Sequence, residues 1–188
     1  MKLFLFAFTI LLSAFSFASE KFNLSQQSST VEFQAVGKPS MLKINGTGGK
    51  LIGNIEIELN HILGEFKVAL ADLTTGIELR DKHMKEKYLE VSKFPEASFT
   101  ISKIALPAQF LTERKVFSAV PFEGKMKIKN TEKDIAGTAD VDTTDGTQIK
   151  VSTEFKTGIS QYQIDIPTNL GIKVADEVII KTSMNLKK

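Results

Sequence analysis

The chain has 188 residues with 24 basic and 22 acidic side chains, and its formal net charge of +2 is too small to steer the whole protein toward nucleic acid or an anionic membrane. It has no cysteine, which excludes disulfides, thiol catalysis, thiolate metal sites and a lipid anchor on cysteine. Its length suits one domain with a sizeable core.

Residues 1–18 have the composition of a secretory signal peptide. Lys2 is followed by an apolar run that ends in small residues around Ala18. A membrane anchor would need roughly 20 apolar residues, whereas serines interrupt this run from Ser13 onward. We expect cleavage after Ala18, a periplasmic or secreted protein formed by the single domain 19–188, and no stable membrane insertion.

Most of the remaining chain alternates apolar and polar residues, which is the period of a half-buried strand. The predicted strands lie at residues 31–35, 55–59, 66–70, 98–102, 120–129, 149–155 and 178–186. A series of such strands separated by turn signals predicts a sandwich or a closed barrel. The Asp145-Gly146 pair predicts a tight hairpin.

One segment, residues 78–89, breaks the strand pattern. It is rich in helix-forming residues and contains neither glycine nor proline. Arg80, Met84 and Tyr88 lie four residues apart and would share one helix face. The sequence therefore predicts a short helix here, and a second helical or irregular stretch at 159–171.

The chain around this helix resembles the central signature of the YceI-like family. The resemblance is carried by residues 74–101, TTGIELRDKHMKEKYLEVSKFPEASFTI, with a similar T-G-x-x-x-R-D-x-H motif, Y-L pair and P-x-x-x-F strand. Residues 122–130 and 176–186 are also similar to family segments. The chain departs from the family pattern because it has no tryptophan, and no histidine at residues 28–36.

This resemblance implies an all-β fold: an extended, antiparallel, eight-stranded lipocalin-like barrel with a short helix at about 78–89. It also implies binding of a long polyisoprenoid, such as an isoprenoid quinone or a prenyl phosphate, inside the barrel. An eight-stranded barrel is wide enough either to be filled by its own side chains or to hold one slender ligand.

Both of these interiors remain open from the residues alone. The inward-facing apolar residues could simply form a packed core, or they could line a lumen in which apolar burial, at roughly 25 cal/mol per Å², would hold a prenyl tail. Flat phenylalanine walls and adaptable methionines favour the ligand. The predicted lumen residues are Phe33, Phe66, Val68, Phe99, Ile101, Phe122, Met126, Ile128, Phe155, Val178, Ile180 and Met184.

Polar residues of the predicted helix form a candidate head-group site at the barrel mouth, namely Arg80, His83 and Tyr88. Arg80 could hold a quinone carbonyl or a phosphate through charge-assisted hydrogen bonds. The alternative is structural, in which Arg80 and Asp81 form an ion pair or tie the helix to the barrel. We favour the structural role, because adjacent residues of a helix point in different directions.

Few residues suggest catalysis or metal binding. Glu58 and His61 have Glu-x-x-His spacing, but positions three apart on one strand point to opposite faces, so a zinc site is not expected. The acidic run at 140–145 lacks the twelfth-position acid of a calcium loop and predicts a strand end and a hairpin. We expect no enzyme activity, no metal and no cofactor beyond the lipid itself.

The sequence therefore predicts a periplasmic lipid-binding protein that holds a long isoprenoid, of quinone or polyprenyl phosphate type, for transport or storage, and that could form an oligomer. The alternative is a packed barrel that acts through its surface as a stress-response or interaction accessory without a lipid. A bulky tryptophan at Phe122 or Ile128 should separate the two, because it should weaken lipid uptake while the fold survives.

Overall fold

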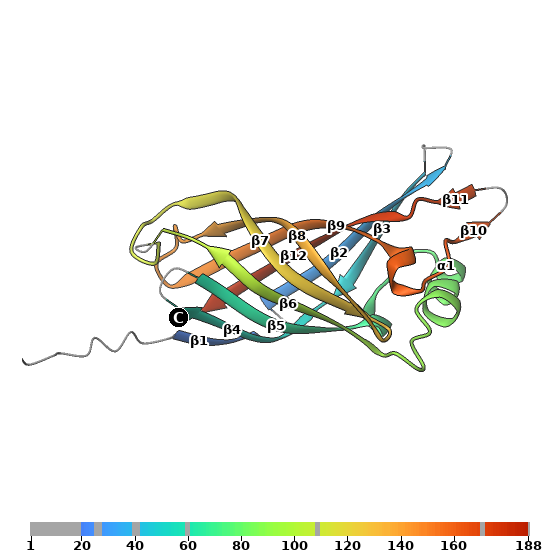
Figure 1. Cartoon of the computed structure of the whole chain (residues 1–188), viewed down its shortest axis with the longest axis horizontal. Helices are drawn as coiled ribbons and strands as arrows, with labels where there is room; N and C mark the ends of the chain where they lie inside the picture. The colour runs from blue at the N-terminus through green and yellow to red at the C-terminus, as the bar shows by residue number, and fades with distance from the viewer. Residues whose placement is uncertain are drawn as a thin grey trace, which may run out of the picture.

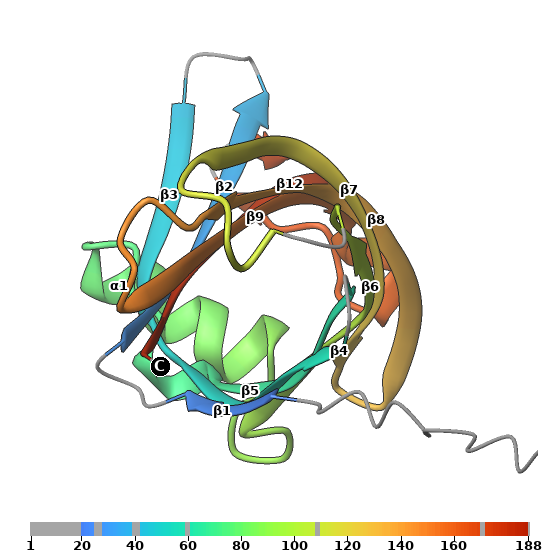
Figure 2. The same cartoon turned by 90° about the vertical axis from the view of Figure 1, so that its left-hand side faces the viewer.

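The computed structural model describes residues 20–24, 28–38, 42–58, 61–107, 110–169 and 172–187. The predicted signal peptide, residues 1–18, lies outside them. Twelve strands form one antiparallel sheet that rolls up into an elongated barrel-like shape, seen from the side in Figure 1 and from one end in Figure 2. This single antiparallel sheet confirms the predicted all-β fold class. A short helix interrupts the strands at the predicted place.

The strands pair in the order β1-β4-β5-β6-β7-β8-β9-β12-β2-β11-β10, and β3 also pairs with β2. Their bounds are β1 (Glu20–Leu24), β2 (Ser29–Lys38), β3 (Leu42–Gly49), β4 (Leu51–Glu58), β5 (His61–Ala69), β6 (Glu96–Ala105), β7 (Val116–Ile128), β8 (Thr131–Asp142), β9 (Gln148–Gly158), β10 (Thr168–Asn169), β11 (Ile172–Val174) and β12 (Glu177–Lys187).

Within the described residues the sheet has twelve strands instead of the expected eight. Seven strands account for the predicted segments, except that Leu70 belongs to a short helical turn, Lys129 follows the end of β7, and residue 59 lies outside the described part of the chain. The other five are β1, β3, β8, β10 and β11, which are very short or rich in glycine and polar residues. Their sequences therefore lack the clear alternation of apolar and polar residues that identified the other seven.

A bent segment formed by β3 and β4 connects the two sides of the rolled sheet. β3 pairs with β2, and only Lys50 separates β3 from β4, which pairs with β5. Gly48 has a φ of +89°, and a Cβ there would lie 2.4 Å from the carbonyl oxygen of Asp72, so this turn requires glycine. The buried Ser29 hydroxyl links β2 to β4, because it donates to the Leu51 carbonyl at 3.0 Å and accepts from the Leu51 N–H at 2.8 Å.

The helical segments are short. They are the 3₁₀ turn η2 (Leu70–Asp72), the α-helix α1 (Glu78–His83), the π-helical turn η3 (Met84–Tyr88) and the 3₁₀ turn η4 (Ile159–Tyr162). η4 and the irregular residues 163–167 agree with the stretch predicted at 159–171, whereas Thr168 and Asn169 form β10 and residues 170 and 171 are not described. Among the described residues, no helix has the length and apolar character needed to cross a membrane.

The connection between β8 and β9 differs from the prediction of a tight hairpin at Asp145-Gly146. Residues 143–147 form a longer loop, and neither Asp145 nor Gly146 has a positive φ. The carboxylates of Asp142 and Asp145 instead accept hydrogen bonds from the N–H groups of Thr144 and Thr147, each at 2.9 Å. These local bonds satisfy the loop backbone without the left-handed residues of a tight turn.

Candidate functional site

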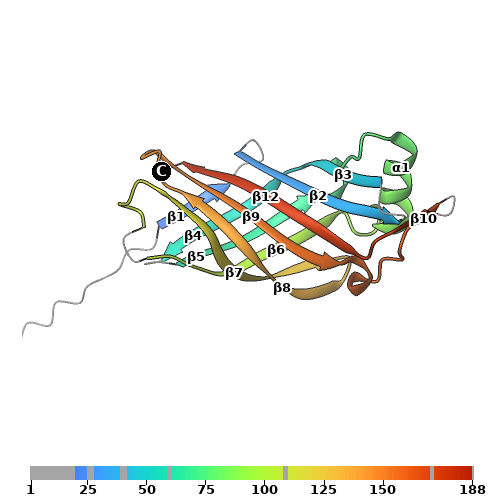
Figure 3. The ribbon, with the colours of Figure 1, turned by 90° about the horizontal axis from the view of Figure 1, so that it is seen from above.

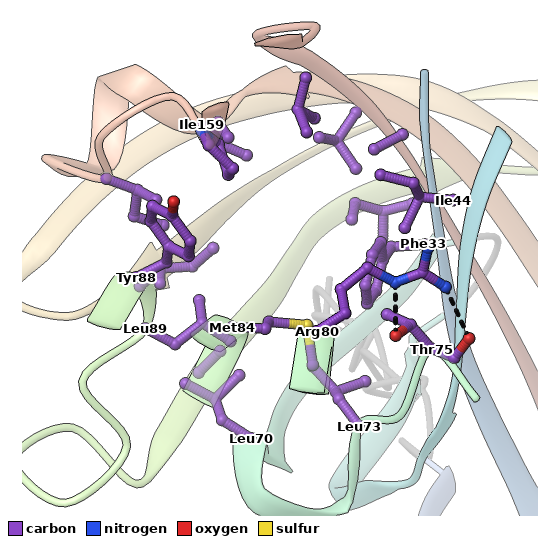
Figure 4. Close-up of a pocket in the computed structure, with 18 of the residues that line it drawn as sticks. Phe33, Ile44, Leu70, Leu73, Thr75, Arg80, Met84, Tyr88, Leu89 and Ile159 are labelled. Carbon is purple, nitrogen blue, oxygen red and sulfur yellow. Dashed lines mark hydrogen bonds between the residues drawn. The ribbon is translucent and has the colours of Figure 1, made fainter. Parts of the chain in front are cut away.

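A cavity of about 670 Å³ opens at the end of the sheet where α1 lies. Its volume falls within the range of about 300–1,000 Å³ that is usual for small-molecule sites. Strands β2, β3, β6, β7 and β12 supply apolar walls, and α1 with η3 covers one side of the mouth. Figure 4 shows side chains from β2, β3, α1 and η3, among them Phe33, Ile44, Arg80 and Tyr88, around the same space.

Two phenylalanines form the inner end of the cavity. Phe99 and Phe155 both line it, and their rings stack with an interplanar angle of 1° and centroids 5.4 Å apart. Behind them lie Phe66, stacked on Phe99 at 5.9 Å, and Phe122, which meets both rings edge-on. This aromatic cluster separates the hollow half of the barrel from a half that its own side chains fill.

The predicted lumen residues divide between these two halves. Eight line the cavity: Phe33, Val68, Phe99, Met126, Ile128, Phe155, Val178 and Ile180. The other four belong to the packed core and do not line the cavity: Phe66, Ile101, Phe122 and Met184. Alternation along a strand predicts which side chains point inward, but it does not predict how far along the barrel the hollow part extends.

The helix brings all three predicted head-group residues, Arg80, His83 and Tyr88, to the cavity. Met84 and Lys87 of the same segment also line it, because the wider π turn from Met84 to Tyr88 presents successive residues over a broad face. Short π segments inside helices occur frequently at functional sites.

Arg80 is held by Thr75 and not by Asp81. Its Nε donates to the Thr75 hydroxyl and its Nη2 to the Thr75 carbonyl, both at 2.8 Å (Figure 4). Among the described residues Arg80 forms no ion pair with a carboxylate. The structure therefore gives Arg80 a structural contact while leaving its side chain at the cavity wall.

Asp81 anchors the start of the helix to the preceding loop. Its carboxylate accepts hydrogen bonds from the Thr74 hydroxyl at 2.5 Å, from the Thr75 N–H at 2.7 Å and from the Thr75 hydroxyl. Burial acts to raise the pKa of Asp81, but the hydrogen bonds from Thr74 and Thr75 outweigh it and hold the pKa below its ordinary value. The carboxylate is thus engaged by the two threonines.

The cavity lining contains basic but no acidic side chains among the described residues. The basic residues are Arg80, His83 and Lys87. A site with these groups favours an anion or a strong hydrogen-bond acceptor near the helix. The rest of the wall is almost entirely apolar.

Several wall residues lie outside the strands. Leu70 was predicted as the end of a strand but begins the η2 turn, Leu73 follows that turn, and Ile159 and Ile164 belong to the η4 region. The spacing of Leu70 and Leu73, three residues apart, suits one turn of helix and is the signal that could have indicated them. Lys87 was also missed, because it looked like an ordinary solvent-exposed lysine of the helix.

Glu58, the last residue of β4, pairs with His61, the first residue of β5, so the two are not on one strand as expected. Paired residues project from the same face of a sheet, so the expectation of opposite faces was wrong. No third ligand accompanies them, since no group of three or more His, Cys, Asp or Glu side chains suited to a metal ion occurs in the described part of the chain.

These features define a barrel-like antiparallel β protein with an internal apolar cavity at one end. A family model described as YceI-like domain matches residues 22–186. The chain therefore belongs to the YceI-like family, as the motif around the helix predicted.

Solved structures share the fold at low sequence identity. A polyisoprenoid binding domain from Saccharophagus degradans, implicated in plant cell wall breakdown, has a TM-score of 0.64 at 13% identity, over 92% of this chain and 99% of its own. BcnA from Burkholderia cenocepacia has a TM-score of 0.68 at 18% identity, over 86% and 98%. The Campylobacter jejuni YCEI protein has 0.61 at 16%, over 79% and 87%. No curated protein sequence matches the chain.

Proposed function

We propose that the protein binds an isoprenoid lipid, with the prenyl tail in the cavity and the head group beside α1. The apolar cavity of about 670 Å³ carries this proposal. Binding needs no precise polar contacts along the tail, since roughly 25 cal/mol per Å² of buried apolar surface suffices. The Saccharophagus degradans relative, a polyisoprenoid binding domain of the same fold, supports the assignment.

The charges at the mouth favour an anionic head group within this class. Arg80, His83 and Lys87 could surround a prenyl phosphate, whose several oxygens accept more than one charge-assisted hydrogen bond. A quinone offers single carbonyl oxygens and would use fewer of these donors. We therefore propose a prenyl phosphate as the preferred ligand and a quinone as a weaker one.

The role that fits such a site is carriage or storage outside the cytoplasm, without making or breaking bonds. The signal-peptide pattern of residues 1–18 supports export. The apolar wall would shield a tail that water solvates poorly.

Native mass spectrometry of the protein as purified, followed by organic extraction, tests this proposal. We expect a stoichiometric mass increment that extraction identifies as an isoprenoid. Titration of the stripped protein with a prenyl phosphate and with a quinone of equal tail length should favour the phosphate. An unloaded mass together with no uptake of either compound would refute the proposal, and equal uptake of both would refute the preference for an anionic head.

A further inference from the structure

The rim of the cavity mouth is both apolar and exposed. Leu42, Ile77, Leu79 and Ile172 line the cavity, yet 40%, 54%, 62% and 37% of their respective surfaces remain accessible. These four make up most of the six large hydrophobic residues that are exposed in the described chain. Exposed apolar side chains that gather at one place mark an interaction site, whereas scattered ones do not.

The four residues come from separate elements at the same end of the molecule. Leu42 begins β3, Ile172 begins β11, and Ile77 and Leu79 stand at the start of α1. Figure 3 shows α1 and β10 at one end of the barrel and the C-terminus at the other. A Cβ placed on Gly37 would lie 3.0 Å from Ile172 Cγ2 and 3.3 Å from Leu42 Cβ, so these two side chains flank one point of the wall.

Near the rim, the paired ends of β2, β3 and β11 carry lysines on the face that points away from the cavity. Lys38 lies directly opposite Lys173 in the β2–β11 pair, and Lys43 lies opposite Val36 in the β2–β3 pair, so all three lysines share the outer face. Each is exposed, and none has a carboxylate partner among the described residues. Like charges directly opposite each other destabilise a sheet, and a nearby anionic surface would offset this repulsion.

We propose that this end of the molecule docks reversibly on the surface of an anionic lipid bilayer. The rim residues would enter the interfacial layer, and the lysines would reach the lipid phosphates while their apolar stems cover the sheet. The inference rests on the proposed function, because the mouth would then open onto the phase in which an isoprenoid lipid resides. The attraction is local to the lysine cluster, since Glu78 and Glu86 on the helix limit the charge elsewhere.

Vesicle co-sedimentation of the protein, purified after expression of the full chain, tests the docking. Phosphatidylcholine vesicles are compared with vesicles that contain an equal part of phosphatidylglycerol. The double variant Ile77→Ser, Leu79→Ser should bind the mixed vesicles at least about tenfold more weakly, since it removes two inserting side chains. The matched control is Ile52→Ser, Val116→Ser, which removes the two exposed hydrophobic residues outside the rim.

The charge contribution is tested separately. Lys38→Gln, Lys173→Gln should weaken binding to the mixed vesicles by about fivefold per lysine and leave binding to phosphatidylcholine unchanged. The control is Lys103→Gln, Lys150→Gln, two exposed lysines of β6 and β9 that do not line the cavity. An equal loss of vesicle binding in both double variants would show that the lysines near the rim contribute no more than other exposed lysines, and would contradict the proposal.

The same preparations separate this inference from the proposed function. Bound isoprenoid without any preference for the mixed vesicles would refute the docking and leave the function standing. Vesicle binding that depends on the rim, without isoprenoid uptake, would support docking and refute the function. A dimer in light scattering that Ile77→Ser, Leu79→Ser dissolves, without vesicle binding, would assign the rim to a second copy of the chain and overturn the proposal.

Discussion

Ile128 and Phe122 differ in the space beside them, although they share the inward face of β7. Ile128 is partly buried and lines the cavity, whereas Phe122 is 2% exposed and packs against Phe99 and Phe155. Tryptophan at Ile128 should therefore fill empty space and reduce isoprenoid uptake at least about tenfold. Its cost in unfolding free energy should be less than the roughly 1–3 kcal/mol typical of overpacking. Uptake is measured by extraction and stability by urea unfolding.

Phe122→Trp serves as the control. The sequence suggested that this variant too would weaken lipid uptake, but Phe122 does not line the cavity. Because Phe122 is enclosed, the larger ring should cost about 1–3 kcal/mol of unfolding free energy, and it does not reach the cavity directly. If Ile128→Trp left uptake unchanged, the tail could not lie beside β7.

Lys129 connects the end of β7 to two other segments, those of Glu90 and Gln163. Lys129 Nζ pairs with the Glu90 carboxylate and donates to the Gln163 carbonyl at 3.3 Å, and all three residues have a positive φ of 50–59°. The hydrogen bonds from Lys129 and then Lys93 lower the pKa of Glu90 from 4.5 to about 2. The charged carboxylate therefore favours the folded state above the unfolded pKa of 4.5, and this contribution is lost as the pH falls through about 2.

We expect Glu90→Gln to lower the unfolding free energy at neutral pH, and the difference from the wild type to shrink between pH 4.5 and about 2. Urea unfolding across this pH window measures the difference. Glu86→Gln is the control, since Glu86 is exposed on η3, four residues before Glu90, and forms no ion pair among the described residues. A difference that stayed constant with pH would exclude an ionic origin.

At the scale of elements, the position of the helix depends on Asp81. Its carboxylate accepts three hydrogen bonds from Thr74 and Thr75, and bonds to charged groups contribute about 1.5–3 kcal/mol each when buried. Because Asp81 is only partly buried, we expect Asp81→Ala to cost about 1–2 kcal/mol in total. Hydrogen exchange should increase mainly in residues 74–91.

The matched control for this variant is Asp72→Ala, which removes an exposed carboxylate that forms no side-chain hydrogen bond among the described residues. Isoprenoid uptake should fall with Asp81→Ala alone, because the helix carries Arg80, Met84 and Tyr88 into the cavity wall. Unchanged exchange in residues 74–91 would show that the threonine contacts do not hold the helix.

Individual elements also show what the sequence could predict. The helix at 78–89 was predictable, because its helix formers contrast with the alternating strands around it, and α1 with η3 covers Glu78 to Tyr88. β3 was not predictable, because its glycines hide the alternation. Gly46 is one of these, and a Cβ there would lie 1.9 Å from the ring of Phe33, so the glycine makes room for a cavity residue. Because the requirement for glycine comes from a residue on another strand, the sequence around Gly46 does not reveal it.

At the scale of the molecule, the barrel is neither filled nor hollow throughout. The two interiors that the sequence left open occur together, with the aromatic cluster of Phe66, Phe99, Phe122 and Phe155 between them. The same inward-facing pattern encodes both halves, so the boundary depends on how side chains from different strands meet. That information lies in the strand register, where Phe66 pairs with Phe99 and Phe99 with Met126.

This boundary should limit the length of the tail that the cavity accepts. Phe155 is 3% exposed and closes the inner end with Phe99. Phe155→Leu would remove a ring from that end and deepen the cavity by the volume of the lost ring atoms, so we expect the preferred isoprenoid to become longer. Competition between isoprenoids of increasing tail length, read by native mass spectrometry, measures the preference.

Phe110→Leu provides the matched control, because Phe110 is fully buried and packs edge-on against Phe117 without lining the cavity. Both variants should lose stability, by less than the roughly 3–5 kcal/mol of Phe→Ala. Only Phe155→Leu should change the length preference, because Phe155, unlike Phe110, stands between the tail and the core. The same shift in both variants would indicate general loosening of the barrel, and no shift in either would mean that the aromatic cluster does not set the depth of the site.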